Sequence, residues 1–218
     1  MVLKQSAQSL IILVGHAVNA FTPSNELASN GEALGDLVSL LLDIVTAQGV
    51  GVSEKGDIAR TAQSVMGQVL RVMPAAHFVG AVQSMLESGD DKVCGSHLST
   101  IYISDLCQVR TSVLDLLSEN LPKVSTKTRQ DVSPTIQKIL VSMQSFLSHR
   151  QEGPLAASSF KALKTICLTT SSGEENSLMN FIPILLLSIK GEKATAPAIA
   201  VLPVLTSVSG IIILSLLD

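Results

Sequence analysis

Hydrophobic side chains recur along most of the chain at spacings of three and four residues, which is the period of an amphipathic α-helix. The stretch "EALGDLVSLLLDIV" shows the pattern at Leu34, Leu37, Val38, Leu41, Leu42 and Val45. The same spacing appears in "DIARTAQSVMGQVLRVM", "SVLDLLSENL", "TIQKILVSMQSFL", "AASSFKALKTICL" and "SLMNFIPILLLSI". Only "LSTIYIS" has the composition of a β-strand. The pattern therefore predicts an all-α protein.

The predicted helices follow a repeated order: a proline near the start of an apolar helix, a polar turn, then a second helix rich in small residues. Pro74, Pro134 and Pro183 mark three such first helices, and the last two lie 49 residues apart. HEAT-type helical pairs repeat every ~40–47 residues, and each pair buries its apolar face against the next pair. We therefore predict that residues 1–218 form one HEAT-like α-solenoid of about four to five antiparallel helix pairs.

Residues 93–108, "VCGSHLSTIYISDLCQ", interrupt this order. Without these 16 residues, Lys92 directly precedes Val109, and the spacing from Pro74 to Pro134 falls from 60 to 44 residues. Two explanations remain open. The first is a surface loop between two helices. The second is a translated, unspliced intron: the stretch is in frame, its first codon, for valine, begins with GT, and its last codon, for glutamine, can be CAG, as at the two ends of an intron. A spliced transcript joining the Lys92 codon to the Val109 codon supports the intron hypothesis, and uninterrupted transcripts exclude it.

Several stretches resemble a known family. "VLRVMPAAHFVGAVQSMLESGDDKV" followed by "VRTSVLDLLSENL" resembles the HEAT-repeat family of U3 small nucleolar RNA-associated protein 10, as do "PLAASSFKALKTIC" and "AIAVLPVLTSVSG". The resemblance extends from about Asp57 onward. The chain departs from the family pattern in the insert after Lys92, in the missing Val-Arg start of the helix at 155–169, and in its end at Asp218.

The resemblance implies a fragment from the later part of a longer solenoid. It also implies a non-enzymatic scaffold of the small-subunit processome, which acts in nucleolar processing of pre-18S ribosomal RNA. The implied partners are other processome proteins and the particle of U3 small nucleolar RNA and precursor ribosomal RNA, the latter reached indirectly from this segment. Two alternatives remain: a HEAT-repeat adaptor in transport or signalling, and a helical protein anchored to a membrane at its C-terminus.

The composition gives no general attraction for nucleic acid. The net charge is −3, and aromatic residues, on which bases stack, make up 3% of the chain. The charged fraction of 15% is low for a soluble domain, so most helices should be buried on a wide face. Three cysteines without a pairing pattern are typical of a reducing compartment.

No motif in the chain predicts catalysis, a metal or another cofactor. "GVGVSEKGD" has the glycines of a phosphate-binding loop but lacks its lysine. Cys94, His97 and Cys107 supply only three of the four ligands that a structural zinc site requires. Cys167 lies on an apolar helical stripe, where we expect it to act as a small hydrophobic residue.

One basic stretch is a candidate for phosphate contact. "PKVSTKTRQ" carries Lys123, Lys127 and Arg129, and we predict that it is a loop whose cations either contact a phosphate backbone or are merely solvated. The acidic pair Glu174-Glu175 is expected to serve in a turn and a helix cap.

The C-terminal residues 194–217 carry no charge. This length is sufficient for a membrane span, but Pro197, Pro203 and Gly210 favour the inner helix of a solenoid. We therefore expect no membrane partner. The resemblance implies a nuclear, nucleolar location.

Overall fold

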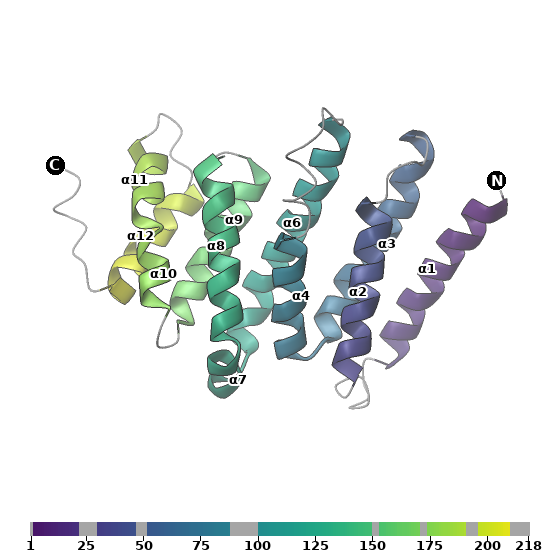
Figure 1. Cartoon of the computed structure of the whole chain (residues 1–218), viewed down its shortest axis with the longest axis horizontal. Helices are drawn as coiled ribbons and strands as arrows, with labels where there is room; N and C mark the ends of the chain where they lie inside the picture. The colour runs from purple at the N-terminus through teal and green to yellow at the C-terminus, as the bar shows by residue number, and fades with distance from the viewer. Residues whose placement is uncertain are drawn as a thin grey trace. The chain divides into compact units, whose positions relative to one another are not determined.

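The computed structural model describes residues 2–21, 30–46, 52–87, 100–149, 153–170, 174–190 and 196–209. These ranges consist of helices and the short turns between them, and they contain no strand, so the all-α prediction is confirmed (Figure 1). The chain divides into two compact units, Met1–Val109 and Arg110–Asp218.

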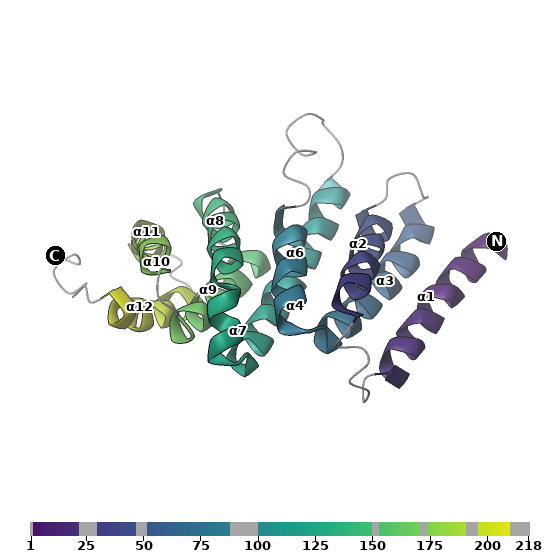
Figure 2. The ribbon, with the colours of Figure 1, turned by 60° about the horizontal axis from the view of Figure 1, so that its bottom comes forward.

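The first unit contains α1 (Val2–Phe21), α2 (Gly31–Thr46), α3 (Val52–Val72) and α4 (Ala75–Glu87). Helix α3 packs against both α1 and α2, and α2 packs in turn against α4 (Figure 2). The predicted stripe of α2 is buried except at Leu37, which is half-buried. The core of this unit includes Ile11, Val18, Val38, Leu41, Val65, Met66, Val69, Phe78, Val79 and Val82.

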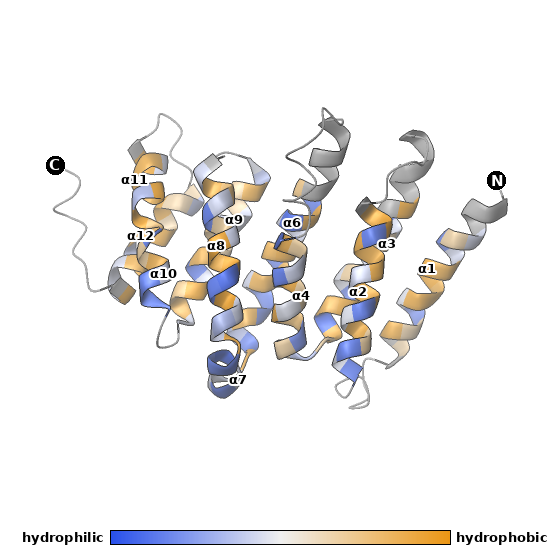
Figure 3. Ribbon diagram, viewed as in Figure 1, coloured by the Kyte–Doolittle hydropathy of each residue, from blue (hydrophilic) through white to orange (hydrophobic). Residues whose placement is uncertain are grey.

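The division between the units falls within α6 (Thr100–Asn120). There follow the 3-10 helix η2 (Leu121–Lys123), α7 (Thr126–Asp131), α8 (Ser133–His149), α9 (Pro154–Leu168), α10 (Glu175–Met179), α11 (Ile182–Lys190) and α12 (Ala196–Ser209). Helix α9 packs against α8 and α12, and α12 also packs against α10 and α11. Hydrophobic and hydrophilic positions alternate along α8, as expected for an amphipathic helix (Figure 3).

Prolines begin the first helices, as predicted. Pro74 directly precedes α4, while Pro134 and Pro183 are the second residues of α8 and α11. The first turn of a helix has no internal partner for its N–H groups, so proline loses nothing there and its fixed φ favours the helical start. Pro203 differs, because it lies inside α12.

Half of the inserted stretch is helical. Helix α6 begins at Thr100, so the expected helix start at Val109 and the loop explanation are both wrong for residues 100–108. The reason is that an established helix gains one hydrogen bond for each residue that extends it, and this outweighs a weak local preference for strand. Residues 93–99 lie outside the described ranges, and the intron hypothesis stays a prediction.

The described part of the uncharged C-terminal stretch is α12. Ala198, Val201 and Leu205 are buried there, and the helix packs against α9. Among the helices that the structure describes, none is both long enough and apolar enough to span a bilayer. Residues 210–218 lie outside the described ranges.

Candidate functional site

The basic stretch is helical rather than a loop. Pro122 lies in the first turn of η2, and the Ser125 side chain caps α7 by accepting a hydrogen bond from the Thr128 backbone N–H, with 3.3 Å between N and Oγ. Lys123 and Lys127 are exposed, and Lys123 Nζ donates to Asn120 Oδ1 at 3.1 Å. The loop prediction was wrong because the two start signals, a proline and a serine cap, were not recognised.

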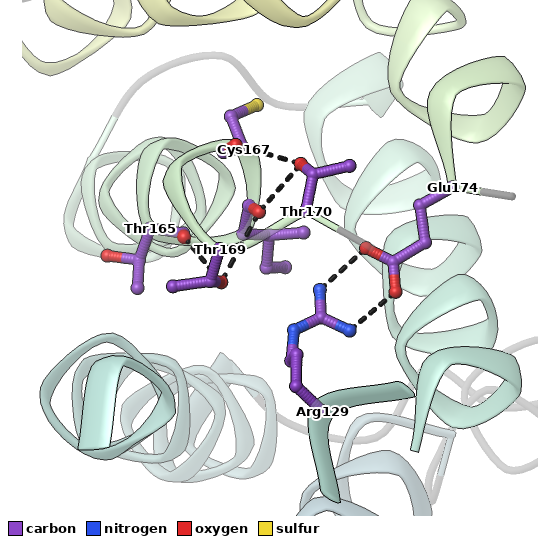
Figure 4. Close-up of polar contacts among 7 residues, drawn as sticks. Arg129, Thr165, Cys167, Thr169, Thr170 and Glu174 are labelled. Atoms are coloured by element: carbon purple, nitrogen blue, oxygen red, sulfur yellow. Dashed lines mark hydrogen bonds and ion pairs between the residues drawn. The ribbon is translucent and has the colours of Figure 1, made fainter. Parts of the chain in front are cut away.

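Arg129, the third candidate, is buried with 4% of its surface exposed. Its Nη1 donates to Glu174 Oε1 at 2.5 Å and its Nη2 donates to Glu174 Oε2 at 2.6 Å (Figure 4). The expectation that Arg129 is a solvated cation able to contact phosphate is therefore wrong. Its guanidinium already holds a carboxylate in the two-pronged geometry that an arginine would otherwise offer to a phosphate.

Glu174 occupies the predicted position but has a different role. It stands at the N-cap of α10, yet its side chain makes no capping hydrogen bond and is fully buried against Arg129. Two buried charges lose their hydration, and their attraction roughly offsets that loss only when both hydrogen bonds form. The pair therefore requires one particular placement of α7 relative to the start of α10, both of which belong to the second unit.

Cys167 lies beside this ion pair at the end of α9 (Figure 4). Its burial raises the pKa of the thiol to about 12, a backbone hydrogen bond opposes the rise, and the Glu174 charge adds to it. Thr170 Oγ1 donates to the Cys167 carbonyl oxygen at 2.8 Å, which satisfies a backbone acceptor at the end of the helix. The thiol is therefore protonated at neutral pH, and the prediction of a small buried hydrophobic residue is confirmed.

Three long-range contacts join residues that lie 45 or 46 positions apart along the chain, whereas the Gln8–Thr61 hydrogen bond spans 53 positions and the contact of Arg110 with the Phe146 ring spans 36. Arg129 and Glu174 are separated by 45 residues, and the exposed pair of Lys161 Nζ and Asp115 Oδ1, 3.2 Å apart, is separated by 46. A Cβ atom added at Gly31, the first residue of α2, would overlap the ring of His77 in α4, which is 46 positions further along. The sequence itself contains these opposite charges 45 and 46 positions apart, at Arg129 and Glu174 and at Asp115 and Lys161.

A groove between α2 and α4, in the first unit, was also missed. It encloses about 450 Å³. Each helix lines it with small residues four positions apart: Gly31, Gly35 and Ser39 on α2, and Ala76, Gly80 and Ser84 on α4. The four-residue spacing is visible in the sequence, but only the packing of α2 on α4 brings the two rows together.

The described residues contain no group of three His, Cys, Asp or Glu side chains placed to hold a metal ion. Of the three zinc-ligand candidates, Cys107 lies half-buried in α6, whereas Cys94 and His97 fall outside the described ranges.

Comparisons of this chain with protein-family models, curated proteins and solved structures find no match. The resemblance to the U3 small nucleolar RNA-associated protein 10 family therefore depends only on the stretches quoted from the sequence.

Proposed function

We propose that the chain is a non-enzymatic scaffold built as a HEAT-like α-solenoid. In such an array each helix pair stacks on the next, and residues in equivalent positions meet at a sequence separation of one repeat. The separations of 45 and 46 residues, seen in three contacts, support this arrangement. They agree with the ~40–47-residue period of HEAT repeats, and they are the main support for the proposal.

The resemblance leads us to propose the small-subunit processome as the particle that this scaffold serves. The chain would hold other processome proteins during nucleolar processing of pre-18S ribosomal RNA. We propose indirect association with the U3 RNA particle. Arg129 is committed to Glu174, and aromatic residues suitable for base stacking make up only 3% of the chain.

Affinity purification of the tagged full chain from nuclear extract tests this proposal. We expect U3 RNA to be enriched over an unrelated small nuclear RNA, and the tagged chain to accumulate in nucleoli. The Lys123→Gln/Lys127→Gln variant should recover as much U3 RNA as the parent chain, because in the proposed indirect association these two exposed lysines do not contact the RNA. If the parent chain recovers no more U3 RNA than the background level, the processome proposal is contradicted. If the parent chain recovers U3 RNA but the double-lysine variant does not, indirect association is contradicted.

A HEAT-repeat adaptor in transport or signalling is the second candidate, favoured by the groove between α2 and α4. An adaptor needs a defined recess for a partner segment, and this groove has the volume usual for a binding site, ~300–1,000 Å³. Cytoplasmic accumulation of the tagged chain, with one protein partner recovered in equimolar amount, would favour this second function.

A further inference from the structure

The groove between α2 and α4 is open because of its glycines. A Cβ added at Gly35 or at Gly80 would meet no atom within 4 Å, so the space above both positions is empty. Val38 and Met85 supply apolar walls. The groove therefore offers exposed helix backbone and apolar surface to a chain that lies along it.

The charged residues of the groove are acidic. Glu32 and Asp36 line its α2 side, and both are exposed. None of the described lining residues is Lys or Arg. The net charge of the first unit is also negative, since this unit contains 5 Lys or Arg residues and 10 Asp or Glu residues. A groove with acidic groups and no cation attracts positive charge, and its partly enclosed walls strengthen that field.

We propose that this groove docks a cationic segment of a partner protein, a short extended stretch in which Lys or Arg alternates with small residues. The small side chains lie over Gly35 and Gly80, while the cations pair with Glu32 and Asp36. An open groove with a volume of about 450 Å³ contacts only a few residues, so the recognised element is short. The proposal rests on the scaffold function but does not depend on the processome assignment.

One of the two acidic residues also has an ordinary structural role. Glu32 lies in the first turn of α2, where a negative charge stabilises the helix. The test must therefore measure binding separately from stability. Glycine positions make this separation possible, because Gly67 in α3 also has empty space where a Cβ would lie, yet it does not line the groove.

The first measurement uses the purified full chain and a short fluorescent peptide of alternating Lys and Ala. We expect saturable binding by fluorescence anisotropy that weakens as salt rises, because salt screens exposed charges. The matched Gln–Ala and Glu–Ala peptides should bind at least about tenfold more weakly. In heteronuclear NMR spectra, the largest shifts on adding the Lys–Ala peptide should occur at Gly35 and Gly80.

The second measurement fills the groove. Gly35→Leu and Gly80→Leu should each weaken Lys–Ala binding by about tenfold or more. Gly67→Leu should leave binding unchanged, and all three variants should melt no lower than the parent chain, since leucine favours a helix over glycine. Glu32→Gln/Asp36→Asn should weaken binding, while Glu119→Gln, which alters an exposed acid in the second unit, should not.

Three results overturn the proposal. They are equal binding of the Gln–Ala and Lys–Ala peptides, Lys–Ala binding that the groove variants leave intact, and self-association of the chain that only the groove variants abolish. The last result would assign the groove to a second copy of the chain. None of these results depends on recovery of U3 RNA, so failure of the processome proposal is a separate outcome.

Discussion

The two units join successive helix pairs by different chemistry. In the first unit α2 approaches α4 through a glycine, with Gly31 beneath the ring of His77, and an acidic groove lies open beside the contact. In the second unit α7 and the start of α10 are joined by the buried pair of Arg129 and Glu174. The separations along the chain are almost equal, at 46 and 45 residues.

The difference teaches that a contact between two helices can bury all of its polar groups or leave accessible surface beside it. In a buried ion pair the charged groups are already hydrogen-bonded to each other and hold one geometry, so they are not accessible to a partner. A glycine contact needs no side chain, so neighbouring positions remain accessible. The surface beside the glycine contact of the first unit is therefore accessible, whereas the ion pair of the second unit fixes the placement of α7 relative to α10.

The largest effect should come from breaking the buried ion pair. Glu174→Ala leaves the Arg129 guanidinium buried without its carboxylate, and we expect a loss of about 3–5 kcal/mol in the free energy of unfolding, measured with urea. Asp115→Asn breaks the exposed pair with Lys161 and should cost less than about 1 kcal/mol, because both partners remain in water.

The paired variant Arg129→Met/Glu174→Leu should recover much of this stability, since well-packed apolar side chains replace such a pair at little cost. Similar losses of stability in Glu174→Ala and Asp115→Asn would show that the buried ion pair matters no more to the second unit than the exposed one.

The glycine contact of the first unit should give the next largest effect. Gly31→Leu forces its side chain against His77, and overpacking of this kind costs about 1–3 kcal/mol. Gly35→Ala, in the same helix and with open space above it, should raise stability by up to about 1 kcal/mol. Urea unfolding of Gly31→Leu in a His77→Ala background checks the cause, because removing the ring should abolish most of the penalty.

Alkaline pH should weaken the second unit through Cys167. The pKa of about 12 in the folded chain lies above the ordinary 9.0, so the folded state holds the thiol proton more tightly than the unfolded state. This contribution to stability is complete below pH 9 and is lost as pH rises from 9 towards 12. At pH 10.5 the loss amounts to about 2 kcal/mol, since one pKa unit corresponds to 1.36 kcal/mol.

Cys167→Val has no thiol to titrate and serves as the reference for this measurement. The difference in unfolding free energy between the parent chain and Cys167→Val should change by about 2 kcal/mol between pH 8 and pH 10.5. A difference that is constant over this range would mean that the thiol pKa is the same in both states.

Helix type and buried faces could be predicted from the sequence because both depend on local spacing. Val113, Leu114, Leu117 and Leu121 were placed on one stripe of a single helix, and all four are buried. The predicted start of α6 was wrong because the composition of "LSTIYIS" favours a strand. In the structure most of these residues extend the helix that follows them, and this outweighs their local preference.

The candidate site was harder to predict because its partners are distant in the sequence. Nothing next to Arg129 indicates that its guanidinium meets a carboxylate 45 residues away, so a buried arginine was read as a solvated one. The groove presented the same difficulty, since rows of small residues on two helices have no consequence until the helices pack side by side.

The smallest effect is expected from deleting residues 93–108. The buried hydrophobic residues that the structure describes in α6 are Val109, Val113, Leu114, Leu116 and Leu117, and these five lie beyond the deleted stretch. Within it, the two side chains whose exposure the structure describes are Cys107, half-buried, and Gln108, exposed, so neither of these two belongs to the fully buried core. Shortening the connection also lowers the entropy cost of closing it, by less than about 1 kcal/mol because nine of the deleted residues, 100–108, are helical.

Calorimetric melting in one buffer should therefore give the deleted form a Tm equal to or above that of the parent chain. The comparison also separates the units, because their division falls between Val109 and Arg110, directly after the deleted stretch. If the stretch is an integral part of the first unit, the deleted form will melt lower and will do so also in the Glu174→Ala background, which weakens only the second unit, whereas a loss that this background abolishes would assign the stretch to the second unit. A lower Tm of either kind would show that the helical half of the stretch, from Thr100, belongs to the packed structure and that the insert hypothesis is wrong.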